Sequence, residues 1–307
     1  MRVKDEATQE KWDSLTKELS QIPFPSRGDI QVQIEYVTAW IRVAHRNEDL
    51  SSFLKWAKRG MQIFIDTPAF CATHPRFYVT ALDHYLSATS QSSDFDKMWE
   101  LIQILKKVDV QEPLVITKKE AALILYELTI YCYAPEYRRK LDLAQLEDIK
   151  IRFDQYKDGF LISRKITINY MLSHLYTILQ DYPSAESYTK QFILHATEKR
   201  RTDLNRVVLL IQTLITVMDQ REDMHQYKTS QHKAAKNTLN NWGDVRDYER
   251  TVLRNLKRIL DCPPSPRDLQ EVLEKFRVEL RADNNTEYNN HQVGVQLFLQ
   301  WLDGMLD

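Results

Sequence analysis

Arginine recurs every fourth residue in the last third of the chain. The four positions are Arg246, Arg250, Arg254 and Arg258. On a helix this spacing places all four guanidinium groups along one face. Guanidinium binds carboxylate and phosphate groups through two parallel hydrogen bonds, so the stripe predicts a binding site for an acidic peptide or a phosphate-bearing partner. The alternative is a solvated helix face on which Asp247 and Glu249 pair locally with the arginines.

A possible pair of metal ligands precedes the stripe. Glu222 and His225 have the Glu-x-x-His spacing that helical di-iron sites use twice, together with two further glutamates. Only one copy is present, and His232 on the same face does not complete a ligand set. The three cysteines are far apart and include no Cys-x-x-Cys pair, which argues against a zinc site. We therefore expect neither a metal nor another cofactor.

Motifs that mark catalytic sites are missing from the sequence. It contains no His-Glu-x-x-His, no Gly-x-Ser-x-Gly and no glycine-rich phosphate loop. The remaining histidines have no partner at a recognisable catalytic spacing. We expect a protein that is not an enzyme. The open alternative is a helical enzyme whose site is assembled from residues that are distant in sequence.

The composition favours long helices. Only 6 of the 307 residues are glycine, so hairpin-rich sheets and phosphate-binding loops are disfavoured. The net charge is −1, which argues against a general nucleic-acid or membrane-surface protein. No apolar run is long enough to span a membrane, and the first residues lack the apolar region of a signal peptide. These features predict a cytoplasmic protein that does not bind a membrane.

Apolar residues follow a 3.6-residue period through most of the chain. The pattern predicts helices at 5–20, 29–46, 48–65, 75–90, 94–108, 117–134, 141–158, 163–180, 182–197, 203–219, 222–241, 245–260, 266–282 and 292–306. Thr117 and Glu120 have the spacing of a capping box, and Pro266 suits the first position of a helix.

Two kinds of helix alternate in this pattern. Residues 117–134, 163–180 and 203–219 are apolar nearly all round, whereas the segments that follow them carry a narrower apolar stripe. A helix covered on several sides has the first pattern, and a helix on the outside has the second. The alternation predicts a two-layer stack of helical hairpins, with residues 1–262 forming the array and 263–307 a C-terminal capping hairpin of the same domain.

A short repeat marks the connections between paired helices. An aspartate is followed by an apolar residue, two variable residues and a second apolar residue, at Asp49–Phe53, Asp94–Met98 and Asp181–Ala185. The recurrence indicates that these hairpins are repeated units.

The third of these units resembles a tetratricopeptide (TPR) repeat. The matching residues are Leu172, Ser173, Tyr176, Asp181, Tyr182 and Ala185, within residues 166–199. Phe53 and Met98 stand where that family has alanine. The chain is similar to divergent bacterial TPR-like proteins, which commonly end in an arginine-rich amphipathic helix like 245–260. The resemblance implies an all-α, right-handed solenoid of about seven hairpins that binds a partner on a curved surface without catalysis.

We therefore expect an interaction scaffold for a peptide or a partner protein. The main alternative is a peptide-sensing transcriptional regulator, although residues 1–65 lack the glycine-containing turn of a helix-turn-helix. An apolar stripe from Trp12 to Ile22 has no preceding helix to cover it. It either caps the stack or packs against another chain, so the sequence allows both a monomer and a homodimer. Some of the six tryptophans and 15 tyrosines are expected to line a binding groove.

Overall fold

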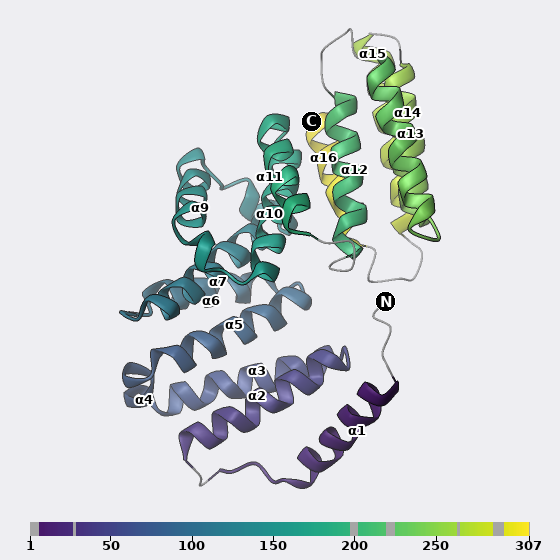
Figure 1. The fold of residues 1–307 in the computed structure, drawn as a ribbon. Coiled ribbons are helices and arrows are strands. Elements are labelled where there is room, and N and C mark those ends of the chain that lie inside the picture. The colour runs from purple at the N-terminus through teal and green to yellow at the C-terminus, as the bar shows by residue number, and fades with distance from the viewer. Residues whose placement is uncertain are drawn as a thin grey trace. The chain divides into compact units, whose positions relative to one another are not determined.

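The computed structural model describes residues 6–26, 29–196, 202–218, 225–262, 265–284 and 292–306 (Figure 1). Within these ranges the regular structure is entirely helical and no residue forms a strand. The predicted all-α class is confirmed. In the same ranges, no helix is both long and apolar enough to cross a membrane.

Every predicted helix is present. They are α1 (Glu6–Gln21), α2 (Ile30–Arg46), α3 (Leu50–Asp66), α5 (Pro75–Gln91), α6 (Phe95–Lys107), α7 (Pro113–Tyr133), α9 (Leu143–Tyr156), α10 (Ile162–Ile178), α11 (Tyr182–His195), α12 (Thr202–Met218), α13 (His225–Asn241), α14 (Asp247–Asp261), α15 (Pro266–Asn284) and α16 (Gln292–Leu306). Residues 222–224, predicted as the start of α13, lie outside the described ranges.

The sequence pattern did not predict three short helices or the correct start of α7. The structure adds α4 (Pro68–Thr73), α8 (Pro135–Arg138) and the single turn η1 (Lys157–Gly159), which are too short to show a 3.6-residue period. The capping box predicted at Thr117 is wrong, because α7 already begins at Pro113. Thr117 lies inside the helix, where its hydroxyl donates to the carbonyl of Pro113 (2.9 Å). Proline suits the first helical position because it has no N–H to leave unpaired.

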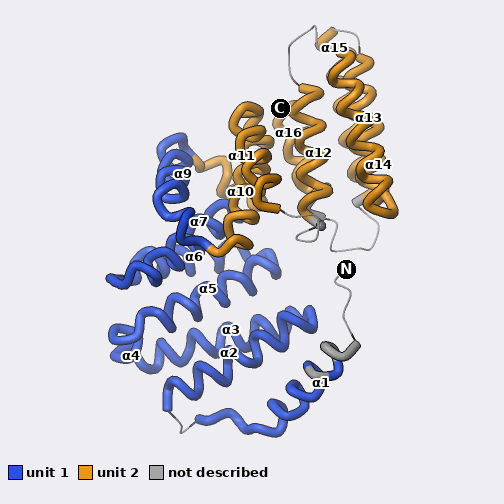
Figure 2. Tube along the Cα trace, in the orientation of Figure 1, with its two compact units in different colours: residues 1–130, 142–160 blue, residues 131–141, 161–307 orange. Residues whose placement is uncertain are grey.

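The chain divides into two compact units (Figure 2). Unit 1 comprises residues 1–130 and 142–160, and unit 2 comprises residues 131–141 and 161–307. In unit 1, α2 packs on α3, α3 on α5, and α5 on α6, while α1 contacts α2. In unit 2 the helices from α10 to α16 pack mostly on their neighbours in sequence.

The last helix of unit 2 also packs on its first long helix. Trp301 of α16 donates its indole N–H to the hydroxyl of Tyr182 (3.1 Å), and Gln180 donates to the carbonyl of Gly304 (2.7 Å). In a solenoid each repeat contacts only its neighbours. The contact of α16 with α10 departs from that rule, so a solenoid of seven hairpins and a separate capping role for 263–307 stay predictions.

The predicted alternation of helix types is visible in the burial. α10 buries side chains on all sides, whereas α11 buries only Ala185, Thr189 and Phe192. The two helices are antiparallel, because Tyr170 faces Phe192 and Tyr176 stacks on Tyr188. Between these aromatic pairs the helices approach closely, and the hydroxyls of Ser173 and Thr189 lie 2.6 Å apart.

The aspartates of the sequence repeat occupy the same place in three hairpin turns. Asp49, Asp94 and Asp181 each precede the second helix, and each carboxylate accepts a hydrogen bond from the backbone N–H three residues later (3.0, 3.1 and 3.1 Å). Each is therefore an N-cap that satisfies one of the unpaired donors of the helix.

The residue before each aspartate has a left-handed backbone. These residues are Glu48, Ser93 and Gln180, with φ of 57°, 56° and 61°. The backbone N–H of the following aspartate bonds to the carbonyl five residues earlier, at 3.0, 3.1 and 3.0 Å. This pattern is a Schellman motif, which ends one helix, and the aspartate starts the next. A reversal of only three residues makes each pair of helices antiparallel.

We predict that Ser93→Gly stabilises the protein. A left-handed backbone conformation destabilises a non-glycine residue by roughly 1–2 kcal/mol. Glycine removes this strain, but it loses more conformational entropy on folding, and this loss cancels part of the gain. The free energy of unfolding should rise by about 0.5–1 kcal/mol in urea denaturation. Ser92→Gly is the matched control, since Ser92 has a right-handed backbone and its hydroxyl donates to the carbonyl of Thr89. An equal loss of stability in both variants would contradict the turn geometry.

Candidate partner-binding surface

The predicted arginine stripe lies along α14. Arg246 precedes the helix as its N-cap residue, and its backbone N–H donates to Glu249 (2.9 Å). Arg250 and Asp247 are both exposed and form an ion pair of 2.8 Å. The predicted local pairing of Asp247 is confirmed.

The other two arginines of the stripe converge on a carboxylate of α15. Arg254 and Arg258 lie 2.9 and 2.7 Å from the two carboxylate oxygens of Glu279. Desolvation raises the pKa of Glu279, but hydrogen bonds from Asn255, Arg258 and Arg254 outweigh it and lower this pKa to about 2. These guanidinium groups therefore join α14 to α15, which favours the solvated-face alternative. Binding of a partner by the stripe stays a prediction.

Glu249 faces the interior of unit 2. It is fully buried, and its two oxygens accept hydrogen bonds from the guanidinium of Arg206 on α12 (2.7 and 2.6 Å). The Nε of Arg246 lies 4.0 Å away. The main partner of Glu249 is therefore Arg206, which is distant in sequence, and not an arginine of the stripe.

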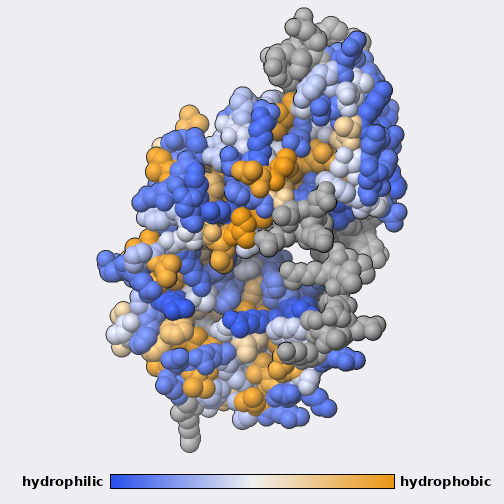
Figure 3. Space-filling model, viewed as in Figure 1, coloured by the Kyte–Doolittle hydropathy of each residue, from blue (hydrophilic) through white to orange (hydrophobic). Residues whose placement is uncertain are grey.

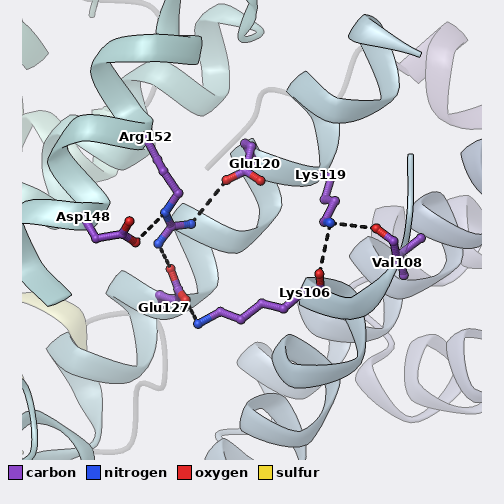
Figure 4. Close-up of polar contacts among 7 residues, drawn as sticks. All are labelled: Lys106, Val108, Lys119, Glu120, Glu127, Asp148 and Arg152. Atoms are coloured by element: carbon purple, nitrogen blue, oxygen red, sulfur yellow. Dashed lines mark hydrogen bonds and ion pairs between the residues drawn. The ribbon is translucent and has the colours of Figure 1, made fainter. Parts of the chain in front are cut away.

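A second charge cluster is internal to unit 1 (Figure 4). Glu127 of α7 is 3% exposed and pairs with Lys106 of α6 (2.6 Å) and Arg152 of α9 (2.5 Å). Arg152 also pairs with Glu120 (3.3 Å) and Asp148 (2.8 Å). Because every charged group here has a partner within the unit, the cluster connects three helices and leaves no charge free for a substrate.

The described histidines of the predicted Glu222–His225–His232 face lie apart from other metal-ligating side chains. His232 is buried with its Nε2 2.8 Å from the carbonyl of Leu253, His225 is exposed, and Glu222 lies outside the described residues. In the described part of the chain, no three His, Cys, Asp or Glu side chains are grouped as metal ligands.

His174 is the most strongly perturbed histidine. It is fully buried between the rings of Tyr133 and Tyr170, at centroid distances of 5.2 and 5.8 Å. Neither ring nitrogen has a hydrogen-bond partner among the described residues. Desolvation, with a smaller contribution from Arg138, lowers the pKa of His174 to about 3. The imidazole is therefore neutral in the folded protein at neutral pH.

We predict that His174 makes stability depend on pH below neutrality. The unfolded chain binds a proton near pH 6.5 and the folded chain only near pH 3, so stability falls as pH decreases through this window. Between pH 7 and pH 5 the loss from this group should be about 2 kcal/mol. His174→Phe should flatten the pH dependence of the urea midpoint in this range. His225→Gln, at an exposed histidine, should leave the dependence unchanged, and an unchanged slope in His174→Phe would refute this origin.

The N-terminal part of unit 1 carries a different arrangement of charges. Five aromatic rings from α1, α2, α3 and the α1–α2 connection lie together with three cations. We call this set the aromatic–cation surface: Trp12, Phe24, Tyr36, Trp40, Trp56, Arg46, Lys55 and Arg59.

Four of these rings contact one another, and Trp12 lies beneath Arg46. Trp40 of α2 and Trp56 of α3 stack with an interplanar angle of 8° and a centroid distance of 5.4 Å. Tyr36 forms T-shaped pairs with Trp56 and Phe24, at centroid distances of 5.7 and 5.6 Å. Spacing explains the arrangement within α2, because Tyr36 and Trp40 are four residues apart and share one helix face. All five rings are half-buried.

The cations of this surface lie over aromatic rings. Arg46 lies over Trp12, Lys55 over Trp56 and Arg59 over Phe24, at 5.0, 5.4 and 4.6 Å from the ring centroids. Among the described residues, none of these cations forms an ion pair, in contrast to the arginines of α14. Two buried donors, Trp40 Nε1 and Arg46 Nε, have no acceptor in the described part of the protein. The surface therefore offers unneutralised positive charge and unused hydrogen-bond donors.

Apolar side chains extend this surface. Leu15, Ile22 and Val32 are 44%, 53% and 49% exposed. Hydrophobic residues appear between hydrophilic ones over this part of unit 1 in Figure 3. No described side chain of α1 is buried, so its predicted apolar stripe is only partly covered. Trp, Tyr and Arg are the residue types that contribute most binding energy in protein interfaces.

No family model, curated protein or solved structure matches this chain. A function for this chain therefore has to be inferred from the chemistry of its own surfaces. The sequence predicted that some of its six tryptophans and 15 tyrosines line a groove, but it indicated neither which of them nor the cations above their rings.

Proposed function

We propose that this chain is a non-catalytic interaction scaffold that binds a peptide or partner protein through the aromatic–cation surface. The observation that carries the proposal is that Lys55 and Arg59 of α3 lie over aromatic rings and have no carboxylate partner among the described residues. A TPR-like array of about seven hairpins is part of the proposal. Three hairpins with the same turn support it, although α16 also packs on α10.

The chemistry of the surface indicates a partner with both acidic and apolar groups. Lys55 and Arg59 are exposed and lack carboxylate partners among the described residues, so a partner carboxylate gains an ion pair without displacing one. The neighbouring apolar side chains supply area that leaves water when a partner binds. Charge complementarity of this kind raises association rates and gives specificity.

Single-stranded nucleic acid fits this surface less well. Bases bind such surfaces by stacking on open aromatic faces. Here Trp40 and Trp56 stack on each other, and Lys55 and Arg59 cover faces of Trp56 and Phe24. A transcriptional regulator is also disfavoured, because α2 and α3 form a long antiparallel hairpin in place of a helix-turn-helix.

We predict that reversing two surface charges abolishes partner binding. Lys55→Glu with Arg59→Glu should lower partner recovery at least about tenfold, because like charges across an interface cost several kcal/mol. The measurement is affinity capture of the tagged full chain from its native extract, quantified by mass spectrometry. The control carries Lys190→Glu with Arg250→Glu, an equal charge change at exposed residues of unit 2.

Three outcomes of this capture experiment can be distinguished. The proposed surface is supported if the control variant still captures the partner, the α3 variant does not, and circular dichroism shows that both variants are folded. If only the control variant fails to capture the partner, the partner binds the helices of unit 2 instead. Equal recovery by all three proteins would exclude both surfaces.

A further inference from the structure

One ring of the aromatic–cation surface, that of Phe24, belongs to a peptide segment of the chain that packs on the other residues of the surface. Residues 22–26, with the sequence Ile-Pro-Phe-Pro-Ser, connect α1 to α2 without forming a helix. The ring of Phe24 lies edge-on to Tyr36 and beneath the guanidinium of Arg59. The hydroxyl of Tyr36 donates to the carbonyl of Ile22 (2.9 Å). One side chain and one backbone carbonyl of the segment are thus bound specifically.

The sequence of this segment prepares it for binding. Pro23 and Pro25 each fix their own φ, and each restricts the residue before it to extended conformations. Ile22 and Phe24, the two residues that contact Tyr36, are the residues before these prolines. The N–H of Ser26 donates to the carbonyl of Phe24 (2.8 Å), so the segment turns at Pro25. A segment whose backbone is already restricted by proline loses less entropy when it docks on an aromatic surface. The contacts therefore show which peptide chemistry the surface accepts.

We infer that this surface is a docking site for a segment with an aromatic residue between two prolines, and that residues 22–26 occupy it as an internal competitor. The inference deepens the proposed function and rests on it, since it names the kind of peptide that the partner presents. The partner's aromatic ring takes the place of Phe24 between Tyr36 and Arg59. The partner's preceding carbonyl accepts the hydrogen bond that Tyr36 now donates to Ile22.

Internal competition sets the expected affinities. A tethered segment has an effective concentration of about 1 mM near its own site. A peptide that binds the vacant site with a dissociation constant of about 100 μM should therefore bind the wild-type chain about tenfold more weakly. Removing the ring of Phe24 vacates the site without altering Tyr36, Arg59 or the two tryptophans.

The test is the binding of a fluorescein-labelled peptide of residues 20–26 to the full chain, measured by fluorescence anisotropy. Phe24→Ala should bind this peptide at least about tenfold more tightly than the wild-type chain does. A peptide with alanine in place of the phenylalanine should not bind. Adding Tyr36→Phe to the Phe24→Ala chain should weaken binding about fivefold, because one hydrogen bond is lost.

Two results would overturn the inference: no saturable binding to Phe24→Ala, or equal binding to the wild-type and variant chains. If Phe24→Ala loses helicity by circular dichroism, Phe24→Leu replaces it and should change the affinity in the same direction. The capture of a partner from native extract tests the proposed function separately. Capture that depends on Lys55 and Arg59, together with no peptide binding, would leave the proposed function standing and remove only this inference.

Discussion

In three hairpins the chain reverses direction within three residues, and the positions of the side chains across each of these hairpins depend on this constraint. A left-handed residue ends the first helix, and the following aspartate accepts the hydrogen bond that starts the second. In α2–α3 the resulting register places Trp40 against Trp56 and His45 against Phe53. It also brings Gly60 close to Val37, where an added Cβ would lie 3.3 Å from a methyl group. The aromatic stack of the proposed surface is therefore a consequence of the turn.

The distribution of charge distinguishes internal surfaces from the proposed binding surface. Buried carboxylates such as Glu127 and Glu249 have arginine or lysine partners, because an unpaired buried charge is costly. On α14, even the half-exposed Arg258 has Glu279. On α2 and α3, Arg46, Lys55 and Arg59 contact rings instead. A cation above a ring keeps its charge, whereas Arg250, Arg254 and Arg258 on α14 have carboxylate partners.

Sequence periodicity was enough to locate the long helices, because each must bury one apolar face. It also located the three aspartates, since the N-cap and the apolar residue four positions later are local features. Sequence periodicity did not predict which charged residues form ion pairs with one another. Glu279 meets Arg254 and Arg258 from another helix, and Arg206 meets Glu249 across 43 positions. The aromatic–cation surface was missed for the same reason: the spacing of Tyr36 and Trp40 defines a helix face, but the neighbours of that face depend on how α1, α2 and α3 pack.

The central claim is that partners bind the face formed by α2 and α3. Hydrogen exchange measured by mass spectrometry, on the full chain with and without its captured partner, tests it most directly. The account predicts slower exchange in the partner complex across residues 30–66, with α14 unchanged. Slower exchange confined to residues 247–261, with none in α2 or α3, would contradict the account and return the binding site to the arginine stripe.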